Sequence, residues 1–488
     1  MKLDRRKAAR SVLWSGIENG GLAAVSLISL IVFTRLLSAR DFGMFSVVLA
    51  LVELIGVLVT MLFHDALIQK RDITDLHFDT AFTATLVLSV ACTVACRLLA
   101  PVFAAAVDYP EATAILIWTS LYFPFAGFTA TIMARQRREF GFRALAQRSL
   151  VGRIAGAAVG ITAAGLGAGL WSLVVQQLTT ALVASTVLWV TCTDRPRLRF
   201  GSTEFVELVS FGAFSVGALF LGFSIKRVFT IIAGALLGPT AAGFLNLSFR
   251  MVDVLWAIAA TAVSQVVMPM LANLQSDRDR LRRAYRKAVA FTCIVLYAGF
   301  IGLGVTSSEV VELLFGRHWL PSSPYVTALA FLVLVQAPRL FATPVLTAVA
   351  RPHAPLAGCL LQLCVMLGIV GCFGLPSIGW AVGVWIACEI VMIPVSIWLV
   401  HRMTGLGLRD QYGGAVMPFA AAMVMALVVT AARIWLVQNF GAVARLVVLA
   451  PLGAAIFVAA LWLLDRALIA DASSFALIAV RRKPATAA

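Results

Sequence analysis

The feature that most constrains this chain is a long succession of apolar stretches, each about as long as a lipid bilayer is thick. A membrane-spanning helix needs about 20 apolar residues, and fourteen such stretches follow one another between residues 11 and 464. The runs are continuous, whereas strands of an outer-membrane barrel alternate over about 10 residues. We therefore predict an all-α polytopic membrane protein with about 14 transmembrane helices. They are expected near 11–34, 43–63, 80–100, 112–133, 150–168, 169–192, 208–234, 241–271, 283–304, 325–349, 354–375, 377–400, 413–435 and 442–464.

The composition excludes most soluble protein classes. Hydrophobic residues make up 61% of the 488 residues and charged residues only 13%, against about 25% charged residues in an average soluble domain. A soluble enzyme, a fibrous protein and a disordered chain are therefore excluded. The net charge of +16 would by itself fit a nucleic-acid-binding protein, so the placement of the basic residues decides between the two explanations.

The basic residues gather on one side of the predicted membrane. With the N-terminus inside, 28 of the 39 Lys and Arg residues, among them those from Arg135 to Arg148, fall in inner segments and 6 in outer loops. Cytoplasmic loops of membrane proteins carry such an excess. The sequence thus predicts a multi-pass membrane protein with both termini in the cytoplasm, and no nucleic-acid partner.

An internal duplication organises the chain. The segment 36–43 (LLSARDFG) resembles the segment 236–243 (LLGPTAAG), and the same offset of 200 residues pairs Glu53 with Asp253. Further on, an offset of 214 pairs Gly165, Gly169 and Trp171 with Gly379, Gly383 and Trp385. Repeats of six spans have the same topology, which predicts two six-helix lobes related by a pseudo-twofold axis along the membrane normal. We expect an N-terminal lobe at 1–200, a C-terminal lobe at 201–405, two additional helices at 406–470 and a cytoplasmic tail at 471–488.

Several basic residues lie within the predicted spans. A charge at the bilayer centre costs at least about 2.5–3.5 kcal/mol on insertion scales, so such residues should face a wet cavity or form pairs. A phosphate or diphosphate is the natural ligand of a guanidinium group, which binds its oxygens bidentately. The candidate diphosphate-binding residues are Lys226, Arg227, Arg250 and Arg339. For Arg250 an ion pair with Asp253, three residues away on the same helix face, is an equally good interpretation.

Acidic residues within the spans are candidates for coupling or gating. Glu53 and Glu389 lie near the middle of their predicted helices, and Asp253 is the repeat equivalent of Glu53. A carboxyl group in a low-dielectric site can take up a proton near neutral pH. The alternative for each is a structural hydrogen bond to a neighbouring helix.

Enzyme motifs are absent from the sequence. It contains no phosphate-binding P-loop, no His-Glu-x-x-His zinc motif and no Gly-x-Ser-x-Gly nucleophile motif. We therefore expect neither catalysis nor a metal site nor a bound cofactor. A membrane-embedded glycosyltransferase or polymerase is disfavoured, because the outer loops are too short for a catalytic loop.

Short motifs give the chain its resemblance to a known family. They are Leu36-Leu37, Asp41-Phe42-Gly43, Ala66-Leu67-Ile68-Gln69, Gly169-Leu170-Trp171-Ser172-Leu173, Arg195-Pro196, Phe211-Gly212, Leu237-Gly238-Pro239 with Gly243, Met268-Pro269, Leu281-Arg282-Arg283-Ala284-Tyr285, and Leu314-Phe315-Gly316 with Trp319. In order and spacing they resemble the Wzx-type polysaccharide transporter (flippase) family, in particular its WzxC-like branch, within the multidrug/oligosaccharidyl-lipid/polysaccharide exporter superfamily. Two departures stand out: Ala39 replaces a common Pro, and Ser224-Ile225-Lys226-Arg227 replaces a common Asn-x-Asp.

The resemblance implies a substrate and a pathway. The expected substrate is an oligosaccharide repeat unit on undecaprenyl diphosphate, moved by alternating access from the cytoplasmic to the periplasmic leaflet of the bacterial cytoplasmic (inner) membrane. Glycosyltransferases, a polysaccharide polymerase and membrane lipids are the implied partners, and a proton or sodium gradient is the implied energy source. A lipid II flippase, a multidrug or cation antiporter of the same superfamily, and a non-transporting scaffold of an envelope assembly complex are the alternatives.

Overall fold

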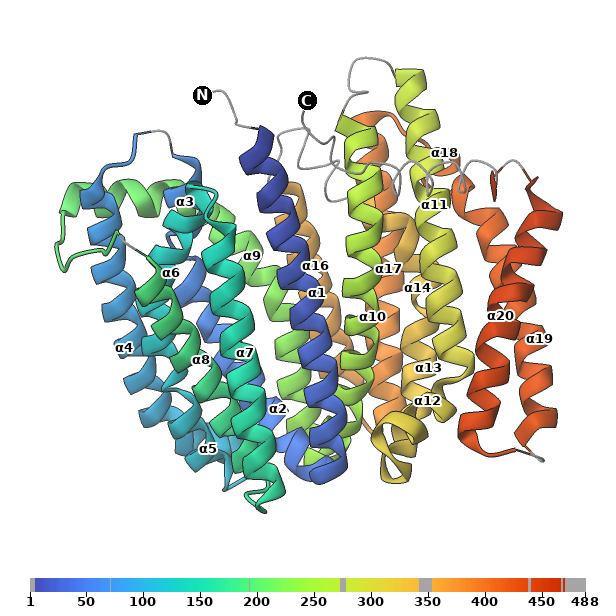
Figure 1. The fold of residues 1–488 in the computed structure, drawn as a ribbon, viewed down its shortest axis with the longest axis horizontal. Helices are drawn as coiled ribbons and strands as arrows, with labels where there is room; N and C mark the ends of the chain where they lie inside the picture. Colours follow the sequence, from blue (N-terminus) through green and yellow to red (C-terminus); the bar gives the residue numbers. More distant parts are fainter. Residues whose placement is uncertain are drawn as a thin grey trace. The chain divides into compact units, whose positions relative to one another are not determined.

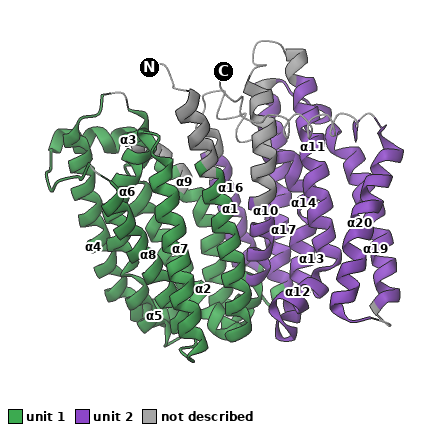
Figure 2. Cartoon of the chain, in the orientation of Figure 1, with its two compact units in different colours: residues 1–246, 373–378 green, residues 247–372, 379–488 purple. Residues whose placement is uncertain are grey.

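A computed structural model describes residues 5–469, apart from 71, 193, 273–277, 342–352, 438–439 and 467. The described chain is almost entirely helical and forms two compact units (Figure 2). Unit 1 comprises residues 1–246 and 373–378, and unit 2 comprises residues 247–372 and 379–488. The predicted tail at 471–488 lies outside the described residues.

Unit 1 is a bundle of helices (Figure 1). Its helices are α1 (Arg5–Leu36), α2 (Ala39–Met61), α3 (His64–Gln69), α4 (Asp75–Ala106), α5 (Ala112–Thr119), α6 (Tyr122–Arg138), α7 (Phe142–Gly165), α8 (Trp171–Thr191), α9 (Ser202–Leu237) and the start of α10 (Pro239–Ala272). Within it α1 packs against α7, α4 against α6, α7 against α8, and α2 against α9.

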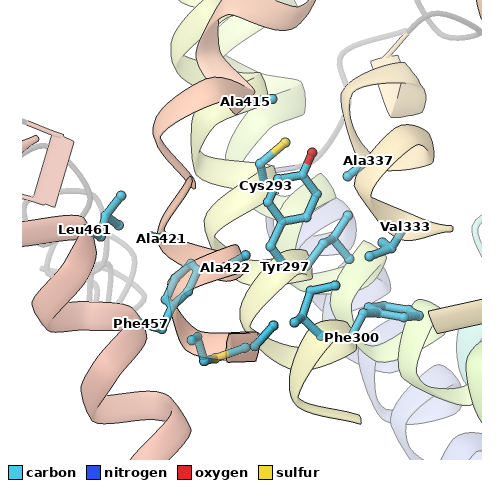
Figure 3. Packing of buried hydrophobic residues seen from close by; sticks show 14 of the residues in the cluster. Cys293, Tyr297, Phe300, Val333, Ala337, Ala415, Ala421, Ala422, Phe457 and Leu461 are labelled. Atoms are coloured by element: carbon cyan, nitrogen blue, oxygen red, sulfur yellow. The ribbon is translucent and has the colours of Figure 1, made fainter. Parts of the chain in front are cut away.

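Unit 2 contains the rest of α10 and all the later elements. They are α11 (Arg278–Val305), α12 (Ser307–Phe315), η1 (Arg317–Ser322), α13 (Ser323–Phe331), α14 (Val333–Gln336), η2 (Ala337–Phe341), α16 (His353–Phe373), α17 (Ile378–Thr404), α18 (Leu408–Tyr412), η3 (Gly413–Ala415), α19 (Val416–Val437) and α20 (Ala442–Leu464). The core of the unit is built around α11, whose Tyr297 and Phe300 lie among buried residues of α14, α19 and α20 (Figure 3). The Tyr297 hydroxyl donates a 2.7 Å hydrogen bond to the Leu334 carbonyl oxygen, which satisfies this buried polar group.

All fourteen predicted spans contain helix, and twelve helical segments in the described residues are long and apolar enough to cross a membrane. The other two predicted spans fall in α7 and α10. The sequence prediction did not include the short helices α3 and α12, and the predicted span 325–349 is interrupted at α14 and η2. The fold class is confirmed as all-α and membrane-spanning.

The first half of the duplication has a structural counterpart. Helices α2 and α10 begin at Ala39 and Pro239, which are 200 residues apart. Before α2 the Ser38 side chain caps the helix by accepting a hydrogen bond from the Asp41 N–H. Before α10 the chain turns at Gly238, whose φ of +89° favours glycine. The two helix starts therefore share a register but use different local signals.

The later correspondence is not reproduced by the helices. Gly165 ends α7 and Gly169 lies in the turn before α8, whereas Gly379 and Gly383 lie inside α17. The compact units also differ from the predicted lobes 1–200 and 201–405, since α9 belongs to unit 1. Contacts in one conformation can group a helix of one repeat with the other repeat, so the lobe assignment stays a prediction.

A stripe of glycines on α7 permits close packing against α8. A Cβ atom on Gly152 would lie 2.8 Å from the Ala184 Cβ, and one on Gly156 would lie 1.9 Å from the Thr180 Oγ1. Glycine spacings of this kind let helix backbones approach closely in membranes. Here the close approach is within the chain.

Charged side chains hold together the end of unit 1 where α3 lies. Arg138 donates to the carbonyl oxygens of Leu67 and Lys70 at 2.8 and 2.7 Å. The Asp79 carboxylate accepts from the Arg197 N–H at 2.8 Å, which fixes the linker before α9. Some of the predicted inner basic residues therefore have a structural role at this end.

A buried carboxylate attaches the last two long helices to unit 2. Glu309 of α12 is completely buried and accepts hydrogen bonds from Arg433 of α19 and Arg445 of α20 at 2.9 and 3.0 Å. Glu309 lies outside the candidate spans. Burial raises its pKa, but the hydrogen bonds, led by that from Arg433, outweigh it and leave the pKa below the ordinary value. The interaction of ionised Glu309 with the two arginines therefore stabilises the fold at any pH above the ordinary carboxyl pKa. This stabilisation is lost as the pH falls through the lowered pKa of Glu309.

Candidate functional site

An ion pair joins α2 and α9 at membrane depth in unit 1. The Arg227 Nε lies 2.6 Å from the Glu53 Oε2, and the two side chains are 30% and 38% exposed. The residues are 174 positions apart in sequence, so only the packing of α2 against α9 brings them together. Contact between charged side chains and lipid is energetically costly. This partly exposed ion pair between two apolar helices should therefore face a wet space.

A second ion pair lies in unit 2. The Arg339 Nη1 of η2 lies 3.5 Å from the Glu389 Oε2 of α17 and donates a 3.2 Å hydrogen bond to the Glu389 carbonyl oxygen. Gln362 of α16 donates to the other carboxylate oxygen at 3.0 Å. The Arg339 side chain is 24% exposed and the Glu389 side chain 12%. Glu389 therefore has both a charged partner and a neutral hydrogen-bond donor.

Each pair joins one candidate of each predicted class. Arg227 and Arg339 were predicted to bind diphosphate, and Glu53 and Glu389 were predicted to act in coupling or gating. A guanidinium group has five N–H donors, and a single carboxylate leaves several of them available to an anion. The arrangement is thus suited to an exchange in which phosphate oxygens compete with a carboxylate for the same arginine.

The other three candidates are placed separately. Lys226 is partly buried on α9 next to Arg227 in unit 1. Arg250 is partly buried and Asp253 exposed on α10 in unit 2. Asp253 thus differs in exposure from its repeat equivalent Glu53, which is partly buried. Whether the four basic candidates act as one site stays a prediction.

Sequence reasoning missed a polar cluster inside unit 1. Arg148 of α7, which was assigned to an inner basic segment, interacts electrostatically with Tyr122 of α6 and Glu18 of α1. Glu18 accepts a 2.7 Å hydrogen bond from Ser149, and Tyr122 in turn interacts electrostatically with Glu53. In the sequence, only the position of Arg148 at the edge of an apolar run could have indicated this polar cluster. Among the described residues, no three His, Cys, Asp or Glu side chains are placed to hold a metal ion.

Comparison with solved structures places this fold among known transporters. A lipid II flippase MurJ structure in an inward closed conformation matches with a TM-score of 0.75 and 13% identity, covering 94% of this chain and 100% of that chain. An inward-facing multidrug resistance transporter of the MATE family, which belongs to the MOP superfamily, matches with a TM-score of 0.59 and 15% identity, covering 79% of this chain and 95% of that chain. At these identities the likeness shows the fold.

Curated relatives carry names from polysaccharide biosynthesis. The succinoglycan biosynthesis transport protein ExoT of Rhizobium meliloti is 23% identical over 476 residues, which is 96% of this chain and 95% of the relative. The lipopolysaccharide biosynthesis protein WzxC of Escherichia coli is 25% identical over 344 residues, or 68% of each chain. The resemblance inferred from the motifs is thereby confirmed. Residues 32–324 match a family model described as polysaccharide biosynthesis protein, and because the match covers more than half of the chain, the chain belongs to that family.

Proposed function

We propose that this protein is a flippase that moves a lipid-linked oligosaccharide from the cytoplasmic to the periplasmic leaflet of a bacterial inner membrane. Arginines at membrane depth that are partly exposed and paired with a carboxylate carry the proposal, one in each unit. The names of the relatives supply the substrate class, a polysaccharide precursor. Undecaprenyl diphosphate is the carrier whose phosphates such an arginine binds.

The sequence of events follows from the chemistry of the ion pairs. The sugar head of the substrate is polar and needs a wet path, while its lipid tail stays in the bilayer. Phosphate oxygens replace the carboxylate at either ion pair, Glu53 at Arg227 or Glu389 at Arg339, because a phosphate accepts bidentate hydrogen bonds from guanidinium. The released carboxylate then lacks the arginine that balanced its charge. Proton uptake at these carboxylates couples transport to a gradient, and no covalent bond is made or broken.

The orientation and the partners complete the proposal. Both termini lie in the cytoplasm, in keeping with the excess of basic residues in the segments assigned to that side. Glycosyltransferases on that side supply the lipid-linked repeat unit, and a polymerase on the periplasmic side consumes it. A drug antiporter for cations is not favoured, because Lys226 lies beside Arg227 where an acidic cavity would be required.

Deletion of the gene tests this function in cells. We expect surface polysaccharide to be lost and the lipid-linked repeat unit to accumulate, with both effects reversed by the wild-type gene. The measurement is surface polysaccharide together with the extracted lipid-linked precursor. Normal polysaccharide in the deletion strain would contradict the proposal, as would loss of viability through failure of peptidoglycan synthesis.

A further inference from the structure

The duplicated motif brings two glycines into a reciprocal contact within unit 1. A Cβ atom on Gly43 of α2 would lie 1.8 Å from the Pro239 carbonyl oxygen, and one on Gly243 of α10 would lie 2.0 Å from the Ala39 carbonyl oxygen. Ala39 and Pro239 are equivalent in the two repeats, and so are Gly43 and Gly243. Each glycine therefore opposes the first helical residue of the other repeat, and any side chain at either position would force the two backbones apart.

The contact continues along α2 and α9 toward the middle of the membrane. A Cβ atom on Gly234 would lie 2.3 Å from the Val47 Cγ2, and the Tyr109 hydroxyl donates a hydrogen bond to the Gly234 carbonyl oxygen. Further along the same two helices lies the Glu53–Arg227 ion pair. From one contact to the next the residue number increases on α2, from Val47 to Glu53, and decreases on α9, from Gly234 to Arg227. The two helices therefore run antiparallel.

Burial changes sharply along this line of contacts. Residues 42–50 of α2 are all buried, and Val47 is 0% exposed. The Glu53 side chain, ten residues from Gly43 and thus about 15 Å further along the helix, is 38% exposed. A dry, tightly packed segment therefore separates a partly exposed ion pair from the helix ends.

At the Gly43–Gly243 crossing itself, the two helix surfaces can separate without side chains having to disengage. Glycine presents only backbone, so the crossing at Gly43 and Gly243 has no interdigitated side chains. Beside it, Arg40 and Glu111 lie 3.5 Å apart with side chains 61% and 58% exposed, and such an exposed pair contributes little stability. The crossing is thus tight in geometry but weakly fastened, and the side chains that link α2 to α9 lie further along the two helices, at Val47 and Glu53.

We propose that the Gly43–Gly243 crossing and the buried Val47–Gly234 contact between α2 and α9 together form the outer gate of the transport path. Both lie between Glu53 and the start of α2. The inference rests on the proposed function for its direction, since the helix starts at residues 39 and 239 lie on the periplasmic side in that orientation. The gate is closed in this structure, and it opens when α2 separates from α9 and the start of α10. The motif glycines are needed for closure, because a side chain at either position would hold the gate open.

A disulfide across the contact tests the gate. Gly234 and Val47 have Cβ positions 3.4 Å apart, close to the 3.5–4.5 Å of disulfides, so Val47→Cys/Gly234→Cys should cross-link upon oxidation in a background without the eight native cysteines. Gly304→Cys/Ala330→Cys, with a Cβ separation of 3.5 Å inside the second repeat, is the matched control. Loss of modification by a maleimide-polyethylene glycol measures the cross-link.

Oxidation should stop polysaccharide export only in Val47→Cys/Gly234→Cys, the gate pair, and not in Gly304→Cys/Ala330→Cys, the control pair. We expect a fall of more than about tenfold, because a transporter that cannot open cannot turn over, and recovery after reduction. Export unchanged in the cross-linked gate pair would overturn the gate, as would a gate pair that fails to cross-link while the control pair does so.

A second measurement needs no substrate and therefore separates the gate from the proposed function. A reporter cysteine placed by Glu53→Cys should react slowly with an impermeant maleimide added outside spheroplasts. Gly43→Ala should speed that reaction several-fold by holding the gate open. Gly165→Ala, at an exposed site with nothing within 4 Å, should not. Equal rates in all three proteins would overturn the gate, even if wild-type export were normal. A rate increase confined to Gly43→Ala would support it, even if the protein transported another substrate.

Discussion

Arg227→Ala should lower export of the polysaccharide to less than about a tenth of the wild-type rate. A hydrogen bond to a charged group contributes about 1.5–3 kcal/mol, and each 1.4 kcal/mol is a factor of about ten. The substitution also leaves Glu53 without its partner at membrane depth. Surface polysaccharide per amount of membrane-inserted protein is the measurement. Arg97→Ala, the same change at an exposed position of α4 in the same unit, is the control and should export normally.

Exchange of the two charges separates binding from structure. In Glu53→Arg/Arg227→Glu the ion pair between α2 and α9 can form again, so membrane insertion and thermal stability should return toward wild type. Export should stay low, because the guanidinium no longer lies where the diphosphate is bound. Restored export in the exchanged protein would show that the pair serves only to hold the helices together.

Arg339→Ala should cause a loss of similar size in unit 2. The arginine contacts both the side chain and the backbone of Glu389, so its removal leaves a largely buried carboxylate with Gln362 as its described hydrogen-bond donor. Removing one partner of a buried pair typically costs about 3–5 kcal/mol. We therefore expect both lower export and a lower thermal unfolding temperature, with Arg409→Ala at an exposed position of α18 as the control.

The lysine variant distinguishes the two effects at Arg339. Arg339→Lys keeps the charge next to Glu389 and should recover most of the thermal stability. Lysine lacks the planar donor pair that binds phosphate bidentately, so export should recover only in part. Export and stability that recover to the same degree would mean that Arg339 has a structural role alone.

The helices could be predicted because each follows from a local property, a run of apolar residues long enough to cross a bilayer. The duplicated start of α2 and α10 could be predicted for the same reason, since the motif is local. The role of helix α12 could not be predicted in this way, because it depends on contacts of Glu309 with Arg433 and Arg445, which come from helices distant in sequence. Both arginines fall near the ends of the predicted spans 413–435 and 442–464, and the structure places them within α19 and α20.

The candidate residues were found from the cost of burying charge, but their partners were not. Arg227 pairs with a residue 174 positions away and Arg339 with one 50 positions away. No spacing rule within a helix can reveal such pairs, which depend on how helices pack. Arg148 is a similar case: its position at the edge of a span predicts a residue of the inner side, but its interactions with Tyr122 and Glu18 depend on how α1, α6 and α7 pack.

Reconstitution of the purified protein tests the central claim most directly. Liposomes are prepared with a lipid-linked oligosaccharide, and an impermeant glycosidase is added outside to cleave every sugar head in the outer leaflet. With wild-type protein the cleaved fraction should rise within minutes beyond the outer-leaflet share, while Arg227→Ala and protein-free liposomes should stay at that share. A cleaved fraction that is the same with wild-type protein and without protein would contradict the account.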